Sequence, residues 1–167
     1  MTTESPSHTD TSLLELALDS NHLPVSYFSS LLRVVQAALR EVARNDDSTR
    51  QPFIQQPQPV LLLTASVADD DLVMRFHFTD PFDSTPLTEL SAQTFRSFVE
   101  QFGDYLKTLP QPGLWGDAIG GMQTRRHRSE IERRMDQLRL ELRRFPKAKI
   151  GFEEHSISIE AGRIEIE

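Results

Sequence analysis

Apolar residues in this chain follow two different periodicities in turn, and that succession limits the folds it can adopt. They recur at every second position at 14–18, at 72–78 and close to the C-terminus, which is typical of strands with one buried face. They recur at helical spacing at 27–43 and again at 88–109. Because neighbouring strands are joined by short turn-forming segments, we expect antiparallel hairpins rather than a parallel sheet.

These segments predict a two-layer α+β fold. Its sheet would be mostly antiparallel and built from hairpins, with amphipathic helices on one face, in the order β-α-β-β-α-α-β-β. The expected elements are a strand at 14–18, a helix at 27–43, strands at 60–67 and 72–79 joined through 68–71, a helix at 88–109, a helix that ends before Pro146, and two strands around 157–159 and 164–166.

The sequence also suggests a division of the chain into parts. Residues 1–12 are small, polar and without periodicity, which predicts a disordered tail. We expect 13–109 to form an α+β core, interrupted at 45–59 by a linker or long loop rich in proline and glutamine. Residues 110–167 would hold a glycine-rich loop, a basic helix and a C-terminal hairpin. That last part would either complete the sheet or form a small second unit.

The formal net charge of −7 is distributed unevenly. Residues 125–149 hold ten of the 18 basic residues and four acidic ones, a local charge of +6, so the rest of the chain carries −13. Five apolar residues in this segment are spaced by four, three, four and three positions, which predicts an amphipathic helix with a heptad-like seam. The seam residues are Ile131, Met135, Leu138, Leu142 and Phe145.

The basic helix suits contact with a protein, a nucleic acid or a membrane surface. In the first case the seam packs within the chain or on a partner, a second copy included, and the arginines meet acidic residues. A nucleic-acid surface would bind phosphates, but no aromatic residues are interleaved for base stacking, and −13 elsewhere repels a polyanion. A membrane-surface helix would need a more aromatic apolar face. The candidate partner-binding residues are Arg125, Arg126, Arg128, Arg133, Arg134, Arg139, Arg143, Arg144 and Trp115.

The final strand offers a second place for a partner. Residues 163–167 end the given sequence, so a partner strand could pair with this edge. Glu165 and Glu167 would make the edge less prone to indiscriminate pairing.

Signatures of catalysis are missing from the sequence. It contains no cysteine, no phosphate-binding glycine motif, no nucleophile elbow and no paired-histidine metal motif. Weaker combinations are Arg75 and His77 with Asp80 and Asp83, Glu153 with His155, the acidic turn at 69–71 and the glycine-rich loop at 113–121. We assign no catalytic residue, cofactor or metal, and keep a small hydrolase or nucleotide-binding enzyme at Arg75, His77 and this loop as a further alternative.

The sequence therefore favours a non-enzymatic interaction module, working as an adaptor, a regulator or a subunit of a larger assembly. A nucleic-acid-binding regulator is the main alternative. The longest aliphatic run covers only 60–63, and the first twelve residues are polar, so we expect no membrane span, no signal peptide and a cytoplasmic protein.

Overall fold

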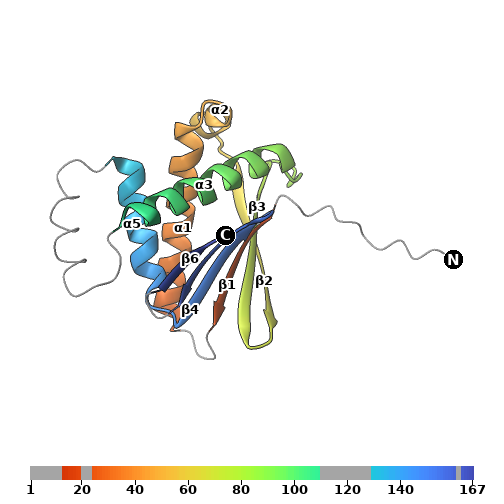
Figure 1. Ribbon diagram of the computed structural model, residues 1–167. Coiled ribbons are helices and arrows are strands. Elements are labelled where there is room, and N and C mark those ends of the chain that lie inside the picture. Colours follow the sequence, from red (N-terminus) through yellow and green to blue (C-terminus); the bar gives the residue numbers. More distant parts are fainter. Residues whose placement is uncertain (1–12, 20–23, 110–128, 161–162) are drawn as a thin grey trace.

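The fold is α+β, with helices packed on one side of a six-stranded antiparallel sheet (Figure 1). The computed structural model describes residues 13–19, 24–109, 129–160 and 163–167. The elements are β1 (Leu14–Asp19), α1 (Val25–Asn45), α2 (Arg50–Ile54), β2 (Val60–Ala68), β3 (Asp71–Thr79), α3 (Thr88–Thr108), α5 (Glu130–Leu142), β4 (Lys147–Phe152), β5 (His155–Glu160) and β6 (Arg163–Ile166). The predicted fold class is confirmed, while the expected tail at 1–12 and the loop at 113–121 lie outside the described residues.

The strands follow the spatial order β2-β3-β1-β4-β5-β6. β1 lies in the interior of the sheet, with Ala17 opposite Val73 of β3 on one side and Lys149 of β4 on the other. Strands from both ends of the chain therefore share one sheet. Its two edges, in the described part of the chain, are β2 and β6.

The β2–β3 hairpin has the predicted bounds within one residue, and its connection is tight. Ala68 pairs with Asp71, so only Asp69 and Asp70 form the turn. Both aspartates adopt left-handed backbone conformations, with φ of 50° and 67°. Two such residues in succession match the twist of the flanking strands, and aspartate tolerates this conformation better than most side chains.

Two elements differ from the prediction. The expected linker at 45–59 contains the short helix α2, whose Phe53 is buried. A sixth strand, β4, follows Pro146 and lies between β1 and β5. Lys147 and Lys149 belong to the basic run at 125–149, but they lie on β4 and not on the helix. They alternate with buried residues and point away from the helices, as a strand with one buried face requires.

The core lies between the helices and one face of the sheet. Leu14, Leu16 and Leu18 of β1 are buried there, as are Phe98 and Phe102 of α3. Four further phenylalanines make successive ring contacts, with centroids 5.1, 5.5 and 5.9 Å apart. They are Phe53, Phe78, Phe95 and Phe152, from α2, β3, α3 and β4. One core therefore includes residues from both 13–109 and 147–167.

Candidate functional site

The predicted apolar seam of α5 packs inside the molecule. Met135, Leu138, Leu142 and Phe145 are buried in the common core, and Ile131 is half-buried against it. The main partner of α5 is α1, which is itself amphipathic. The intramolecular interpretation of the seam therefore holds, and homodimerisation through Ile131–Phe145 is wrong, because the surface that it needs is already covered by this chain.

Polar contacts hold α5 in place around that seam. Tyr105 of α3 donates a hydrogen bond to Asp136 at 2.6 Å, and the same carboxylate oxygen accepts from Arg139 at 2.9 Å. At the start of the helix, the Ser129 hydroxyl accepts the backbone N–H of Glu132 at 3.3 Å. This cap and the acidic first turn both suit a helix N-terminus. These contacts therefore fix the orientation of α5 and with it the side that α5 exposes.

Most of the arginines on this helix have carboxylate neighbours. Arg133 and Arg134 lie 3.7 and 3.3 Å from Glu130, and Arg144 lies 3.4 Å from Glu141. Between 129 and 145 there are five arginines and four carboxylates, so this segment, which extends just beyond both ends of α5, carries only +1. The other predicted partner-binding residues, Arg125, Arg126, Arg128 and Trp115, lie outside the described residues. The local charge of +6 is thus not concentrated on one helical surface.

The exposed side of α5, called here the outer face of α5, combines arginine with one leucine. Its residues follow the helical repeat opposite the seam and are Arg133, Gln137, Leu140, Arg143 and Arg144. Leu140 is 48% exposed, and the Arg144 guanidinium carbon lies 4.9 Å above the ring centroid of Tyr27 on α1. Arginine and tyrosine around an exposed apolar side chain are a composition enriched at protein interfaces.

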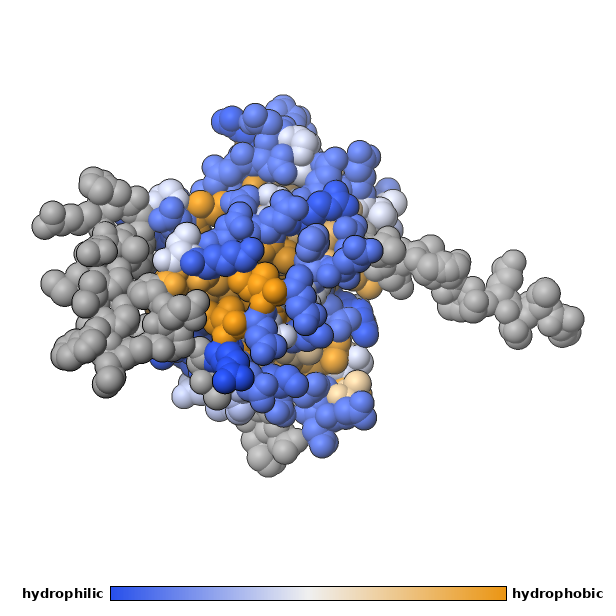
Figure 2. Space-filling view, viewed as in Figure 1, coloured by the Kyte–Doolittle hydropathy of each residue, from blue (hydrophilic) through white to orange (hydrophobic). Residues whose placement is uncertain are grey.

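The β6 edge of the sheet is a second candidate surface; we use this name for Arg163, Ile164, Glu165 and Ile166. On the helix side, Ile166 lies next to Ile157 of β5, and Ile164 lies next to Ile159. The two isoleucines of β5 are buried, but those of β6 are only half-buried. Figure 2 shows apolar residues gathered where Figure 1 places the end of β6 beside α3, within a hydrophilic surround.

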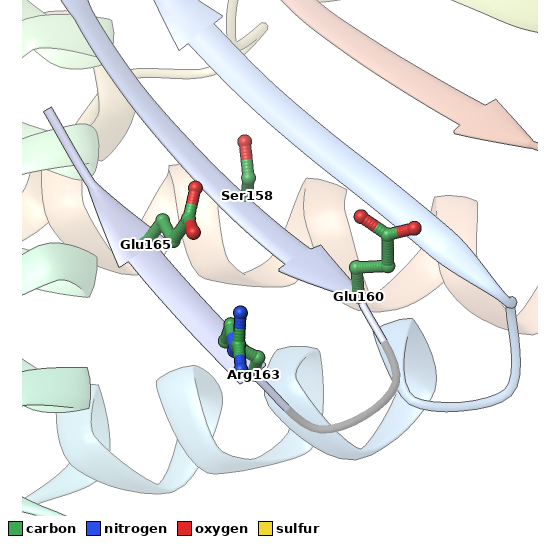
Figure 3. Close-up of a pocket in the computed structure, with 4 residues that line it drawn as sticks. All are labelled: Ser158, Glu160, Arg163 and Glu165. Carbon is green, nitrogen blue, oxygen red and sulfur yellow. The ribbon is translucent and has the colours of Figure 1, made fainter.

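The opposite side of the same edge is polar and hollowed. Ser158, Glu160, Arg163 and Glu165 line a shallow cavity of about 420 Å³ on the face turned away from the helices (Figure 3). Glu160 lies opposite Arg163 in the strand register, and Ser158 lies opposite Glu165. Within the described residues, no hydrogen bond joins these four side chains into a nucleophile–base pair. The cavity therefore offers charge and hydrogen-bonding groups rather than a catalytic arrangement.

The predicted combination of Arg75 and His77 with Asp80 and Asp83 does not converge. Arg75 forms an ion pair with Glu15 at 3.4 Å. Asp80 accepts the backbone N–H groups of the turn that follows it, and Asp83 accepts that of Thr85 at 3.0 Å. This last bond holds the pKa of Asp83 below its ordinary value. Both carboxylates thus stabilise their own loop, and His77 Nδ1 is buried without a hydrogen-bond partner in the described part of the chain.

The second predicted pair, Glu153 with His155, is also separated. Glu153 lies in the β4–β5 turn and binds Arg96 of α3 at 2.9 Å, which raises the pKa of Arg96. Among the residues described, no three histidine, aspartate or glutamate side chains gather into a group that could hold a metal ion. In the same part of the chain, no helix is long and apolar enough to cross a membrane.

The sequence interpretation overlooked the other edge of the sheet. Within the part of the chain that the structure describes, β2 is paired only with β3, and four of its large apolar residues are exposed. Val67 is 76% exposed, and Val60, Leu62 and Leu63 are between 38 and 41% exposed. The nine residues of β2 contain no charge and no proline. That uncharged run was the available signal, but a strand's position at an edge depends on which strands pair, and the sequence does not show this directly.

Comparison with protein-family models, with curated proteins and with solved structures finds no match to this chain.

Proposed function

We propose that this chain is a non-enzymatic protein-interaction module, acting as an adaptor, a regulator or a subunit of a larger assembly, with the β6 edge and the outer face of α5 as its binding surfaces. The observation that carries the proposal is the uncovered end of the isoleucine rows at β6. Ile157 and Ile159 are buried in the core, and β5 has a neighbouring strand on each side, whereas Ile164 and Ile166 have no strand beyond them in the described chain.

An extended segment of a partner fits this edge best. A strand added to β6 would form backbone hydrogen bonds with it and continue the apolar rows beneath α3. On the other face of the sheet, such a strand would lie beside Glu165 and Glu167, which favour basic residues. The partner segment would therefore alternate apolar and basic side chains. The outer face of α5 would add a second contact to acidic residues of the same partner.

Affinity capture from the source cells, with variants compared quantitatively, tests this proposal. The β6 variant is Glu165→Arg with Glu167→Arg, and its charge-matched control is Asp47→Arg with Glu89→Arg, two exposed residues on other elements. A protein held at the β6 edge should be recovered by the wild type and the control, and reduced about tenfold or more by the β6 variant. If every captured protein binds the variant and the control equally, the proposal is wrong.

A second variant tests the contribution of α5. Arg133→Glu with Arg143→Glu changes the charge of the outer face by −4, and Lys147→Glu with Lys149→Glu makes the same change on the open face of β4. Loss of the captured protein with the first pair only would assign the outer face of α5 to the interface. Equal recovery with both pairs would restrict the interface to β6.

Nucleic-acid binding remains the second candidate function, because Arg133 and Arg143 are exposed and extend the basic run of the sequence. Five phosphate contacts would give a log–log salt slope of about −4.5 on duplex DNA. What favours a protein partner is that four carboxylates lie among the five arginines of residues 129–145, where a polyanion would be repelled. A flat salt profile for duplex DNA would eliminate this candidate.

A further inference from the structure

We propose that β2 pairs with β2 of a second copy of this chain, antiparallel about a twofold axis at Thr64, so that one sheet continues through both copies. This surface is distinct from the β6 edge and from the outer face of α5. It lies at the opposite end of the strand order from β6, and in Figure 1 the lower part of the β2–β3 hairpin projects below α3 and lies to the right of α1 and α5.

β2 is a sheet edge without the features that usually prevent pairing with another strand. Sheet edges in folded proteins usually carry a charge, a proline or a bulge, or are covered, because exposed backbone groups recruit other strands. β2 runs for nine residues as Val-Leu-Leu-Leu-Thr-Ala-Ser-Val-Ala, and each residue opposes a single residue of β3 without a bulge. The β6 edge, in contrast, is four residues long and contains Arg163 and Glu165. The charges of β6 favour a partner strand of complementary charge, whereas the longer and uncharged β2 can pair with an identical strand.

Most residues of β2 that face the helix side of the sheet are left uncovered. Leu63, Ala65 and Val67 lie opposite Phe76, Met74 and Leu72, so they point to the helix side of the sheet. Phe76 and Met74 are buried, yet Leu63, Ala65 and Val67 are all exposed. Leu61 of β2 still packs against the core, but along 63–67 the core ends at β3, one strand before the sheet does. A strand beyond β2 would cover this apolar strip.

The sizes of the side chains in β2 favour another β2 as that strand. Pairing about Thr64 places Leu63 opposite Ala65 of the second copy and Leu61 opposite its Val67, all on the helix side. Each larger side chain then meets a smaller one, and threonine meets threonine at the axis, where a hydroxyl pair is favourable in antiparallel strands. On the open face, Leu62 would lie opposite Ser66. A closed pair of this kind is the commonest symmetry of protein oligomers.

Charge is compatible with this arrangement. No residue of β2 is charged, so the twofold pairing brings no like charges together within the strand. Asp69 and Asp70 follow the strand at one end, and in this register they extend past the second copy's strand toward its Pro59 and Gln58, which are neutral. A register with its axis in the hairpin turn at 69–70 would instead oppose the aspartates of the two copies, and the register about Thr64 avoids that repulsion.

Charged substitutions at the axis give a sharp test with the full chain. Thr64→Lys and Thr64→Glu each place two like charges face to face, so each variant should be monomeric in sedimentation or light scattering at about 100 µM, where the wild type is dimeric. An equimolar mixture of the two variants should recover a heterodimer, because only then do opposite charges meet. Ser158→Lys and Ser158→Glu are the matched controls on the open face of β5 and should leave the dimer unchanged.

Three results would overturn the proposal: a monomeric wild type at that concentration, a dimer indifferent to charge at Thr64, or variants that fail to recombine. The first result includes the case in which β2 binds a strand of another protein instead of a second copy. Circular dichroism melting of each variant distinguishes monomerisation from failure to fold.

The absence of cysteine from the chain provides an independent measurement. In Thr64→Cys, oxidised glutathione should convert the two thiols at the axis into one disulfide, because directly opposed strand positions have Cβ atoms close enough for that bond. Ser158→Cys should remain unlinked under the same conditions. Linkage of both variants at equal rates would show random collision and would contradict the symmetric pairing.

Discussion

The Ser30 hydroxyl of α1 donates a hydrogen bond of 2.9 Å to Glu141 Oε1 of α5, joining two helices whose residues are 111 positions apart. The Glu141 side chain is only 13% exposed, and its other oxygen lies 3.4 Å from Arg144 as an ion pair without a hydrogen bond. The hydroxyl of Ser30 is therefore the only group among the described residues that donates a hydrogen bond to this carboxylate. It links the basic segment to the first helix.

Replacing Ser30 by alanine should lower the free energy of unfolding by about 1–3 kcal/mol, because a largely buried carboxylate loses its hydrogen-bond donor. Ser29→Ala is the matched control, since the neighbouring serine is exposed. Urea unfolding of both variants measures the difference. Equal midpoints would show that the contact contributes nothing.

Leu138 and Leu140 lie on opposite sides of α5, one in the core and the other on the outer surface. Leu138 is fully buried in the seam, whereas Leu140 is 48% exposed. Leu138→Ala should destabilise the protein by about 2–5 kcal/mol, and Leu140→Ala should change its stability by less than about 0.5 kcal/mol. Thermal or urea unfolding checks both values. Similar effects at the two positions would contradict the intramolecular position of the seam.

Gly103 in the middle of α3 is not required by close packing. A Cβ atom at this position would lie 3.7 Å from Ile166 Cγ2 and 3.8 Å from Ile157 Cδ1, which are ordinary contact distances. Gly103→Ala should therefore stabilise the protein by about 0.5–1 kcal/mol, because alanine restricts the unfolded chain and favours the helix. A lower unfolding midpoint for this variant would show that β6 cannot accommodate the added methyl group.

The phenylalanine contacts should make the described elements unfold together. Phe95 stacks on Phe78 and also meets Phe152, so it joins α3 to strands on both sides of β1. Phe95→Ala should lower stability by about 3–5 kcal/mol while leaving a single unfolding transition. Calorimetry tests both statements. Separation into two transitions would show that 13–109 unfolds independently of 147–167.

Acidification should weaken the contact between the Asp83 carboxylate and the loop after β3. The backbone N–H of Thr85 stabilises the Asp83 carboxylate and lowers its pKa below 3.8, so the native state holds this proton less tightly than the unfolded chain. The resulting stabilisation is present above the unfolded pKa and is lost as the pH falls through the native one. NMR titration of the Asp83 carboxyl carbon should give a midpoint below 3.8. Thr85→Ala, which keeps the backbone donor, should leave the midpoint below that value, and a midpoint above it would contradict the assignment.

Much of the architecture was predictable because it follows from the local periodicity of apolar residues. The helices at 27–43 and 88–109 and the hairpin at 60–79 each have a repeat long enough to identify, and the structure confirms them as α1, α3 and β2–β3. β4 was missed because its two lysines continued a charged run. The short helix α2 was missed because three prolines lie in and around it.

The candidate surfaces depended on information of another kind. The sequence identified the seam of α5 and the arginines beside it, but whether that seam met a partner or the chain's own α1 was open. Burial of Leu138 and Leu142 decided in favour of α1, since the first helix presents a complementary apolar stripe. The β2 edge could not be recognised from its residues, because buried and edge strands can have the same apolar composition.

The sequence by itself determined which segments become helices and strands, since side-chain period and turn chemistry act between residues close in the chain. It also determined the uneven charge, with +6 at 125–149 and −13 elsewhere. Only the tertiary structure decided where those charges and apolar stripes point. Strand pairing brings β1 between β3 and β4 and places Lys147 and Lys149 on the open face. Among the residues that the structure describes, it leaves β2 and β6 as the edges. Pairing depends on contacts between distant residues, and these give the chain its available surfaces.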